Sequence, residues 1–156
     1  MTPRMAKMLP GDRIEVSEAF GSFVHDGRPS IWLATGTGIA PFASMIRSGI
    51  NRDVTLIHGA RSVDRFYFID ELRSSLGGSY TPCLKPAHDR VRSLEEASSP
   101  PHGVYSGSLS TVLRQIGPTP GRSYFLCGSS RMVVDMRDLL VEIGVPFDTI
   151  VSEIYL

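Results

Sequence analysis

Residues 33 to 42 read Leu-Ala-Thr-Gly-Thr-Gly-Ile-Ala-Pro-Phe, and this stretch decides the fold class. It continues an apolar run from Ser30, which is typical of a strand buried on both faces of a parallel sheet. Two glycines follow the run, and Pro41 stands where a helix can begin. The stretch therefore predicts a strand, a tight turn and the start of a helix.

The same unit recurs along the chain, because apolar runs alternate with segments of helical spacing. We expect strands at 30–35, 53–58, 80–84, 123–127 and 149–154, and helices at 41–47, 67–76, 109–116 and 130–143. Pro82 shortens its strand or places it at an edge, since proline has no N–H to donate. Residues 90–103 are polar and proline-rich and predict a loop. The alternation predicts an α/β fold with a doubly wound, mostly parallel sheet.

The first 29 residues fall outside this alternation. Asp12–Ser17 alternates polar and apolar side chains after Pro10-Gly11, which is typical of a half-buried strand. An unpaired strand is a template for association, so we expect a homo-oligomer formed through it.

Composition narrows the class of ligand. The 156 residues are enough for about one domain, and 42% hydrophobic with 21% charged residues is a globular composition. Sixteen basic residues balance sixteen acidic ones, which argues against nucleic acid or an anionic membrane as a partner. No apolar run approaches the roughly 20 residues of a membrane-spanning helix. With two cysteines and no secretory leader, we expect a cytoplasmic protein with a small ligand.

The glycine turn after the first strand is the leading candidate site. Gly36 and Gly38 fall at the edge of an open parallel sheet where ligands bind. Glycine lets backbone N–H groups approach phosphate oxygens, and the positive end of a helix dipole adds attraction. The turn therefore predicts a site for the pyrophosphate of a dinucleotide. Its spacing is G-x-G-x-x-P rather than G-x-G-x-x-G, so a turn used only for tight packing is the alternative interpretation.

Two further residues stand just after or at strand ends. Arg61 lies about twenty residues past the glycines, where its forked guanidinium suits a ribose 2′-phosphate; a solvated surface arginine is the alternative. Cys127 closes the strand Tyr-Phe-Leu-Cys before Gly128, and a small buried hydrophobe is its alternative reading. The four histidines have no metal-ligand spacing, so we expect no metal site.

Taken in order, these segments resemble the NAD(P)-binding domain of the ferredoxin-NADP reductase family, whose two-domain flavoenzymes begin with a FAD-binding barrel. The matching segments cover nearly the whole chain and are 10–12, 21–23, 33–41, 58–61, 67–72, 126–132 and 152–156. The resemblance implies that 1–29 is a remnant of the barrel, with its strand and a linker, and that 30–156 is the NAD(P)-binding domain. It also implies a flavin oxidoreductase that transfers hydride between NAD(P)H and FAD, with ferredoxin, flavodoxin or an oxygenase component as electron partner.

The resemblance implies a role for each matching residue. Cys127 and Glu153 would flank the place where nicotinamide C4 meets flavin N5, and Tyr155 would cover the flavin ring; these three are the implied catalytic residues. Lys85 stands where the family tends to place Ser-Arg or Thr-Arg at the 2′-phosphate. The implied cofactor-binding residues are Gly21, Ser22 and Phe23, from the final loop of the FAD domain, with Thr35, Gly36, Thr37, Gly38, Ile39, Ala40, Pro41, Arg61, Lys85, Cys127, Gly128, Met132 and Tyr155.

The chain departs from the family in lacking the Arg-x-Tyr-Ser/Thr element of the barrel. We therefore expect NADP or NAD as the cofactor of this chain, and FAD in the complete enzyme. The alternative function is a non-catalytic nucleotide-binding or interaction module, or a truncated gene product without independent activity. The ending Glu153-Ile154-Tyr155 favours the enzyme, since a simple nucleotide-binding module has no need of it. A cysteine-dependent enzyme that uses Cys127 is a weaker third hypothesis.

Overall fold

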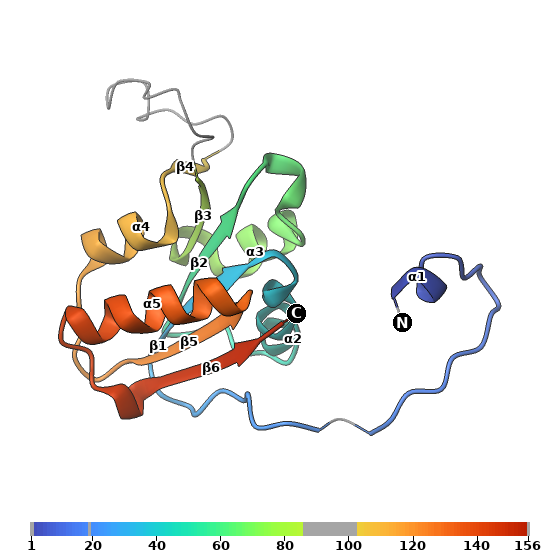
Figure 1. Cartoon of the computed structure of the whole chain (residues 1–156), viewed down its shortest axis with the longest axis horizontal. Coiled ribbons are helices and arrows are strands. Elements are labelled where there is room, and N and C mark those ends of the chain that lie inside the picture. Colours follow the sequence, from blue (N-terminus) through green and yellow to red (C-terminus); the bar gives the residue numbers. More distant parts are fainter. Residues whose placement is uncertain (1, 19, 86–102, 156) are drawn as a thin grey trace.

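The computed structural model describes residues 2–18, 20–85 and 103–155. From Ser30 onward the described residues form a single sheet with helices on both faces (Figure 1). Apart from Gly103, the loop expected at 90–103 lies outside the described residues. The part of the chain that the structure describes holds no helix long and apolar enough to cross a membrane.

The sheet confirms the doubly wound α/β prediction. Within the described residues it has six strands in the order β4-β3-β2-β1-β5-β6, and every neighbouring pair is parallel. The strands are β1 (Ser30–Thr35), β2 (Val54–Ala60), β3 (Tyr80–Leu84), β4 (Tyr105–Ser106), β5 (Ser123–Gly128) and β6 (Ile150–Ile154).

The two-residue strand β4 was not predicted because it is too short to show a period in the sequence. Among the described residues it pairs with Cys83 and Leu84 of β3 alone. Pro82 therefore lies before the first residue that pairs with β4, which agrees with the expectation that proline avoids a fully paired position.

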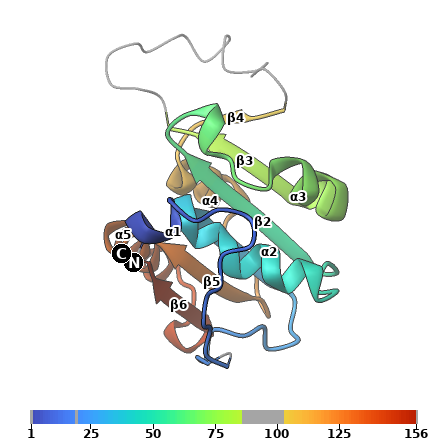
Figure 2. The same cartoon turned by 90° about the vertical axis from the view of Figure 1, so that its right-hand side faces the viewer.

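Two pairs of helices cover the sheet, one pair on each face (Figures 1 and 2). On one face, α2 (Ala40–Arg47) and α3 (Ile69–Leu76) pack on a core that includes Trp32, Leu56 and Phe125. On the other, α4 (Leu109–Ile116) and α5 (Ser130–Glu142) pack on Leu33 and Leu126. The strand β1 thus contributes alternate side chains to two apolar layers, which explains its continuous apolar sequence.

The segment before α3 differs from the prediction of a helix over 67–76. The helix begins at Ile69 because Phe68 adopts a left-handed backbone with φ of 61°, which no helical residue can have. A short 3-10 turn, η2, is formed just before it by Val63–Arg65. Tyr67 is consequently free of the helix and lies at the carboxyl edge of the sheet.

The strand predicted over Asp12–Ser17 is not formed. Ile14 and Val16 are 57% and 81% exposed, and no strand of the described sheet pairs with this segment. In Figure 1 it runs as an extended chain away from the sheet toward the short helix α1 (Thr2–Met5). A strand exists only with a hydrogen-bonded partner, so an alternating pattern supplies the capacity to pair and not the pairing itself.

Residues 23 to 30 nevertheless pack against the sheet and form hydrogen bonds with it. The Phe23 ring packs edge-on against Phe42 and Phe125, with centroids 5.7 and 5.6 Å apart. The Ser123 hydroxyl donates to the Asp26 carboxylate at 2.6 Å, at the amino end of β5. Arg28 pairs with the same carboxylate at 2.7 Å. These contacts fix where the chain enters the sheet and place Phe23 on the face covered by α2.

Candidate functional site

The candidate site lies where the strand order changes direction. From β1 the chain builds the sheet outward through β2, β3 and β4, and then returns to add β5 on the opposite side of β1. The connections that leave β1 and β5 therefore diverge to opposite faces. In open parallel sheets this divergence produces the crevice in which ligands bind.

The two glycines of the first turn have different roles. Gly36 has a positive φ of 55°, a conformation that favours glycine, and its backbone faces a cavity. Gly38 is buried, and a Cβ atom there would overlap the Cys127 carbonyl of the neighbouring strand. Gly38 is therefore a glycine needed for tight packing, whereas Gly36 lines the cavity and fits the predicted ligand-binding turn.

A cavity of about 830 Å³ opens at this edge of the sheet. It extends from the ends of β1, β2 and β3 to the first turns of α4 and α5. Of the predicted residues, the structure brings these together along it: Thr35, Gly36, Thr37, Arg61, Lys85, Met132 and Tyr155. The predicted pyrophosphate turn and the predicted 2′-phosphate residues therefore share one cavity.

The other predicted residues lie around the cavity or away from it. Gly38, Ile39, Cys127 and Gly128 are buried, and Ala40, Pro41 and Glu153 are not among the residues that line the cavity. Gly21 and Ser22 are exposed in the extended segment, while Phe23 packs against Phe42. None of the three residues of the predicted FAD loop thus lines the cavity that Tyr155 lines.

The three implied catalytic residues meet at the ends of β5 and β6. The strand register places Cys127 directly opposite Glu153. The Tyr155 N–H donates to the Gly128 carbonyl at 2.9 Å, which continues the β5–β6 pairing beyond the last residue of β6. Tyr155 also lines the cavity, so this cluster borders one end of it.

The Cys127 side chain is fully buried. Burial, with a smaller contribution from the Glu153 carboxylate, raises the pKa of the thiol to about 12. A cysteine nucleophile needs a lowered pKa, so this environment argues against a cysteine-dependent enzyme. Cys83, which also lines the cavity, is likewise buried with its pKa raised to about 12.

Several residues of the cavity were missed in the sequence. Ser108 and Ser129 cap α4 and α5 by accepting hydrogen bonds from the N–H groups of Thr111 and Met132. The caps set the beginnings of both helices at the cavity, where their dipoles favour an anion. A serine directly before each helical segment is the signal that could have identified them. The sequence predicts no site role for Arg65, which belongs to no motif, or for Tyr67, which it places in the expected helix 67–76.

The charge of the cavity favours an anionic ligand. Its lining includes Arg61, Arg65, Lys85 and Arg131, and Asp135 is the one carboxylate among the described residues of the lining. Asp135 lies 3.7 Å from Arg131. Arg61 is exposed, as expected of a solvated surface arginine, and it also lines the cavity, as expected of a phosphate ligand. The two interpretations are therefore compatible. Among the described residues no group of three or more His, Cys, Asp or Glu side chains could hold a metal.

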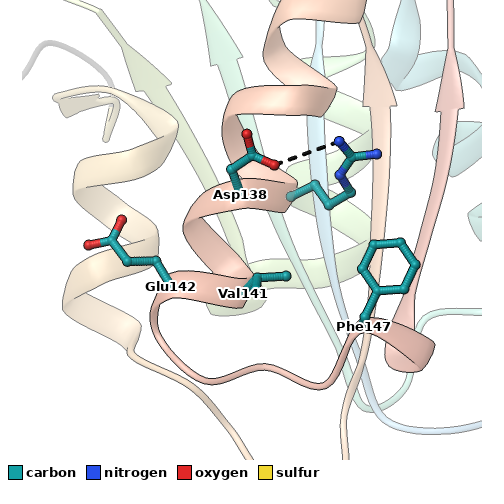
Figure 3. A pocket seen from close by; sticks show the side chains of 5 residues that line it. Asp138, Val141, Glu142 and Phe147 are labelled. Atoms are coloured by element: carbon teal, nitrogen blue, oxygen red, sulfur yellow. Dashed lines mark ion pairs between the residues drawn. The ribbon is translucent and has the colours of Figure 1, made fainter.

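A second, smaller groove lies at the far end of α5 (Figure 3). It measures about 650 Å³ and is lined by Arg137, Asp138, Val141, Glu142 and Phe147. Arg137 pairs with the adjacent Asp138 at 3.6 Å, and Phe147 closes one side. The groove is at the C-terminal end of α5, whereas the first turn of that helix borders the large cavity, and it contains no predicted residue.

A family model described as "Oxidoreductase NAD-binding domain" matches residues 32–138. The chain belongs to this family of oxidoreductase NAD-binding domains. The NAD-binding domain is 33% identical over 151 residues to the flavodoxin/ferredoxin-NADP reductase of Escherichia coli (strain K12), which covers 88% of the chain and 60% of that protein. It is 30% identical over 155 residues to the reductase component of propane 2-monooxygenase from Rhodococcus jostii (strain RHA1), over 90% of the chain and 40% of that protein.

Solved structures agree with the fold. The ferredoxin NADP⁺ reductase from Neisseria gonorrhoeae, with bound FAD and NADP, matches the NAD-binding domain with a TM-score of 0.61 at 23% identity, over 86% of this chain and 60% of that one. These findings confirm the predicted resemblance to the NAD(P)-binding domain of ferredoxin-NADP reductases. The chain spans about half the length of the curated relatives it matches.

Proposed function

We propose that this domain binds NAD(P)H along the large cavity and presents the nicotinamide at the ends of β5 and β6 for hydride transfer to a flavin. The observation that carries the proposal is the juxtaposition there of Cys127, Glu153 and Tyr155, at one end of a cation-lined cavity. A non-catalytic module would need the cavity but not this cluster, so the arrangement favours the oxidoreductase.

The chain's own residues supply binding and orientation. Backbone N–H groups of the turn after β1, with the beginning of α5, would face the pyrophosphate, because both are positive ends of backbone dipoles. Met132 lies beside Gly128 and narrows the crevice. Tyr155 would cover the flavin ring where it meets the nicotinamide, and the protonated thiol of the buried Cys127 would lie beneath that place without acting as a nucleophile. Hydride donation is the chemistry that the nicotinamide supplies when bound, and the protein contributes its position.

The complete enzyme's activity and partners are proposals drawn from the named relatives. A flavodoxin/ferredoxin-NADP reductase and a monooxygenase reductase component suggest ferredoxin, flavodoxin or an oxygenase component as the electron partner. We further propose that residues 1–29 belong with a FAD-binding barrel and that residues 30–156 are the NAD(P)-binding domain. Gly21, Ser22 and Phe23 line neither the large cavity nor the groove at the end of α5, so stable FAD binding would require the remainder of such a barrel. The two free cysteines support a cytoplasmic location.

We also propose that a second copy of the chain pairs with residues 12–17. The exposed Ile14 and Val16 of this extended segment support the proposal, as does the outer edge of β6, which has no strand partner in the described sheet. Size-exclusion chromatography with light scattering should show a dimer or larger species. A monomer at every concentration tested would contradict it.

Calorimetric titration of the chain with NADPH and with NADH tests the main proposal. We expect saturable one-to-one binding that is abolished by Gly36→Val, because a β-branched residue cannot adopt the positive φ of the turn without strain. Gly27→Val is the matched control, since Gly27 also has a positive φ, at 81°, but lies before the amino end of the sheet. Absence of binding by either nucleotide, with the domain folded by circular dichroism, would refute the proposal.

A further inference from the structure

Residues 61–67 form one wall of the large cavity. The side chains of this wall that line the cavity are Arg61, Ser62, Arg65 and Tyr67. The segment lies between β2 and α3, and the three-residue turn η2 is its one regular element among the described residues. Its position therefore depends on the contacts of Phe66 and Phe68, the two aromatic side chains on either side of Tyr67.

Phe66 anchors the wall from the inside. It is only 5% exposed, and its ring packs edge-on against His58 with centroids 5.1 Å apart. His58 is a fully buried residue of β2, and its Nδ1 forms a 3.0 Å hydrogen bond with the Tyr80 hydroxyl of β3. This inner contact fixes Phe66 against two strands of the sheet.

Phe68 needs an anchor on the outside. It is 42% exposed, and its φ of 61° is a left-handed conformation that a bulky residue keeps only where its surroundings hold it. The Leu72 N–H donates to the Phe68 carbonyl at 2.9 Å, which supports the backbone. The ring faces Arg47, whose guanidinium carbon lies 4.9 Å from the ring centre, within the range of a cation–π contact. Arg47 thus holds the side chain of the residue at which the wall joins α3.

Arg47 is itself held by Glu71. Its Nε and Nη2 atoms donate to the two carboxylate oxygens of Glu71, at 2.7 Å each. Because the guanidinium is planar, this fork also fixes the orientation of the plane that lies over the Phe68 ring. Phe68 and Glu71 lie at the beginning of α3, whereas Arg47 is the last residue of α2. The three side chains therefore join α3 to α2, which lies on the same face of the sheet (Figure 2).

The helix α2 is also the continuation of the glycine turn. It begins at Ala40, directly after the turn that starts at Gly36. Gly36 and Thr37 line the cavity, so this turn forms another of its walls. Arg47 does not line the cavity, but it connects the two walls through α2 and α3. Because an exposed ion pair contributes little to the stability of a fold, its main consequence is the position of the wall.

We propose that Arg47 is a positioning residue for nucleotide binding, which acts through Phe68 and Glu71 to set the 61–67 wall relative to the glycine turn. The inference rests on the proposed function, because it concerns how the same cavity is held ready for the same ligand. Without Arg47, Phe68 is free to leave its unfavourable left-handed conformation, and the wall adopts several positions. The nucleotide must then select one of them, which lowers its apparent affinity.

Calorimetric titration of an Arg47→Met variant with NADPH and with NADH tests the proposal. Methionine keeps an unbranched side chain without the guanidinium, so binding should weaken roughly three- to tenfold with little change in melting temperature. Arg47→Lys should lose nearly as much affinity, because an ammonium keeps the charge but cannot form the fork or stack as a plane. Arg114→Met is the matched control, since it removes another exposed inter-helix pair, the one with Glu142, and should leave the affinity unchanged.

Two further measurements establish the route of the effect. Hydrogen exchange should be faster at the backbone N–H groups of residues 61–68 in Arg47→Met, and unchanged at those of residues 40–46. Phe68→Leu should weaken nucleotide binding as Arg47→Met does, and the double variant should be no weaker than either single one, because both remove the same contact. A merely structural arginine would change the melting temperature and leave these measurements as they are.

The outcomes separate this inference from the proposed function. If the unaltered chain binds a dinucleotide and the folded Arg47→Met variant binds it equally well, the positioning role is overturned and the proposed function stands. Additive losses in the double variant would overturn it too. If the unaltered chain binds neither dinucleotide, both fail together. Should Arg47→Met not fold, Glu71→Gln removes the charge that holds the guanidinium and must show the same loss of affinity.

Discussion

Replacement of Gly38 by alanine tests how closely the turn after β1 is packed against the end of β5. An added Cβ would overlap the Cys127 carbonyl and lie 2.5 Å from the Gly128 nitrogen. Both are backbone atoms of a fully buried strand end, so no side-chain rotation can relieve the contact. Either η1 (Gly36–Ile39) or the end of β5 must move; η1 contributes Gly36 and Thr37 to the cavity lining, and the lining residue Ser129 directly follows β5.

The expected cost follows from this geometry. Overpacking a well-filled interior costs about 1–3 kcal/mol, and the rigid backbone neighbours place Gly38→Ala at the upper end, near 3 kcal/mol. With a urea m-value of about 1–3 kcal/mol/M, the midpoint of unfolding should fall by roughly 1–3 M. In a domain of this size the melting temperature should fall by about 6–12 °C. Binding of NADPH should weaken in parallel, because the displaced loops border the cavity.

Urea unfolding followed by far-UV circular dichroism measures the effect. Gly78→Ala is the control, since a Cβ at Gly78 would meet nothing within 4 Å and no positive φ opposes it. That variant should be neutral or stabilised by about 0.4–1 kcal/mol, because alanine restricts the unfolded chain. If Gly38→Ala is as stable as Gly78→Ala, the loops are not in the contact described, and the division of roles between Gly36 and Gly38 is refuted.

Three further predictions follow from buried and paired groups. Burial would raise the pKa of Asp26, but hydrogen bonds from Ser123 and Arg28 outweigh it and lower the pKa from 3.8 to about 2. Because solvent screens this exposed carboxylate, the resulting stability is about 1 kcal/mol; it is present above pH 4 and lost as pH falls toward 2. Urea unfolding should therefore show a cost for Asp26→Asn at pH 7 that shrinks by pH 2.5; an equal cost at both would contradict it. Burial lowers the pKa of His58 to about 4, so NMR should show its imidazole neutral down to that pH, and a titration near 6.5 would contradict the burial. Tyr80→Phe leaves Nδ1 of His58 without its hydrogen-bond partner and should lower the free energy of unfolding by about 1–3 kcal/mol. The Cys127 thiol should resist a thiol reagent such as DTNB in the native chain and react in urea, and Cys127→Ser should slow hydride transfer in a reconstituted complete enzyme without unfolding it; unchanged transfer rates would remove its proposed role.

Most of the fold could be read from the order of the residues. The segments Ser30–Thr35 and Ser123–Gly128 are apolar without interruption, and such runs between helical periods indicate a parallel sheet. Boundaries were less certain where a single backbone conformation decides them. Phe68 shows this, because nothing in its side chain signals a left-handed residue that delays α3 to Ile69. The two-residue β4 was missed, since its existence depends on the neighbouring end of β3.

Some residues of the candidate site could likewise be predicted from the sequence, and others could not. The sequence by itself determined the alternation of strands and helices along the chain, the glycine turn, the residues at strand ends and the ending Glu153-Ile154-Tyr155, because these are patterns within a few neighbouring residues. Only the tertiary structure decided that Arg65 and Tyr67 share a cavity with Arg61 and Lys85. Only the tertiary structure decided, likewise, that no strand forms at 12–17. Pairing, burial and charge density depend on which distant segments the folded chain brings together.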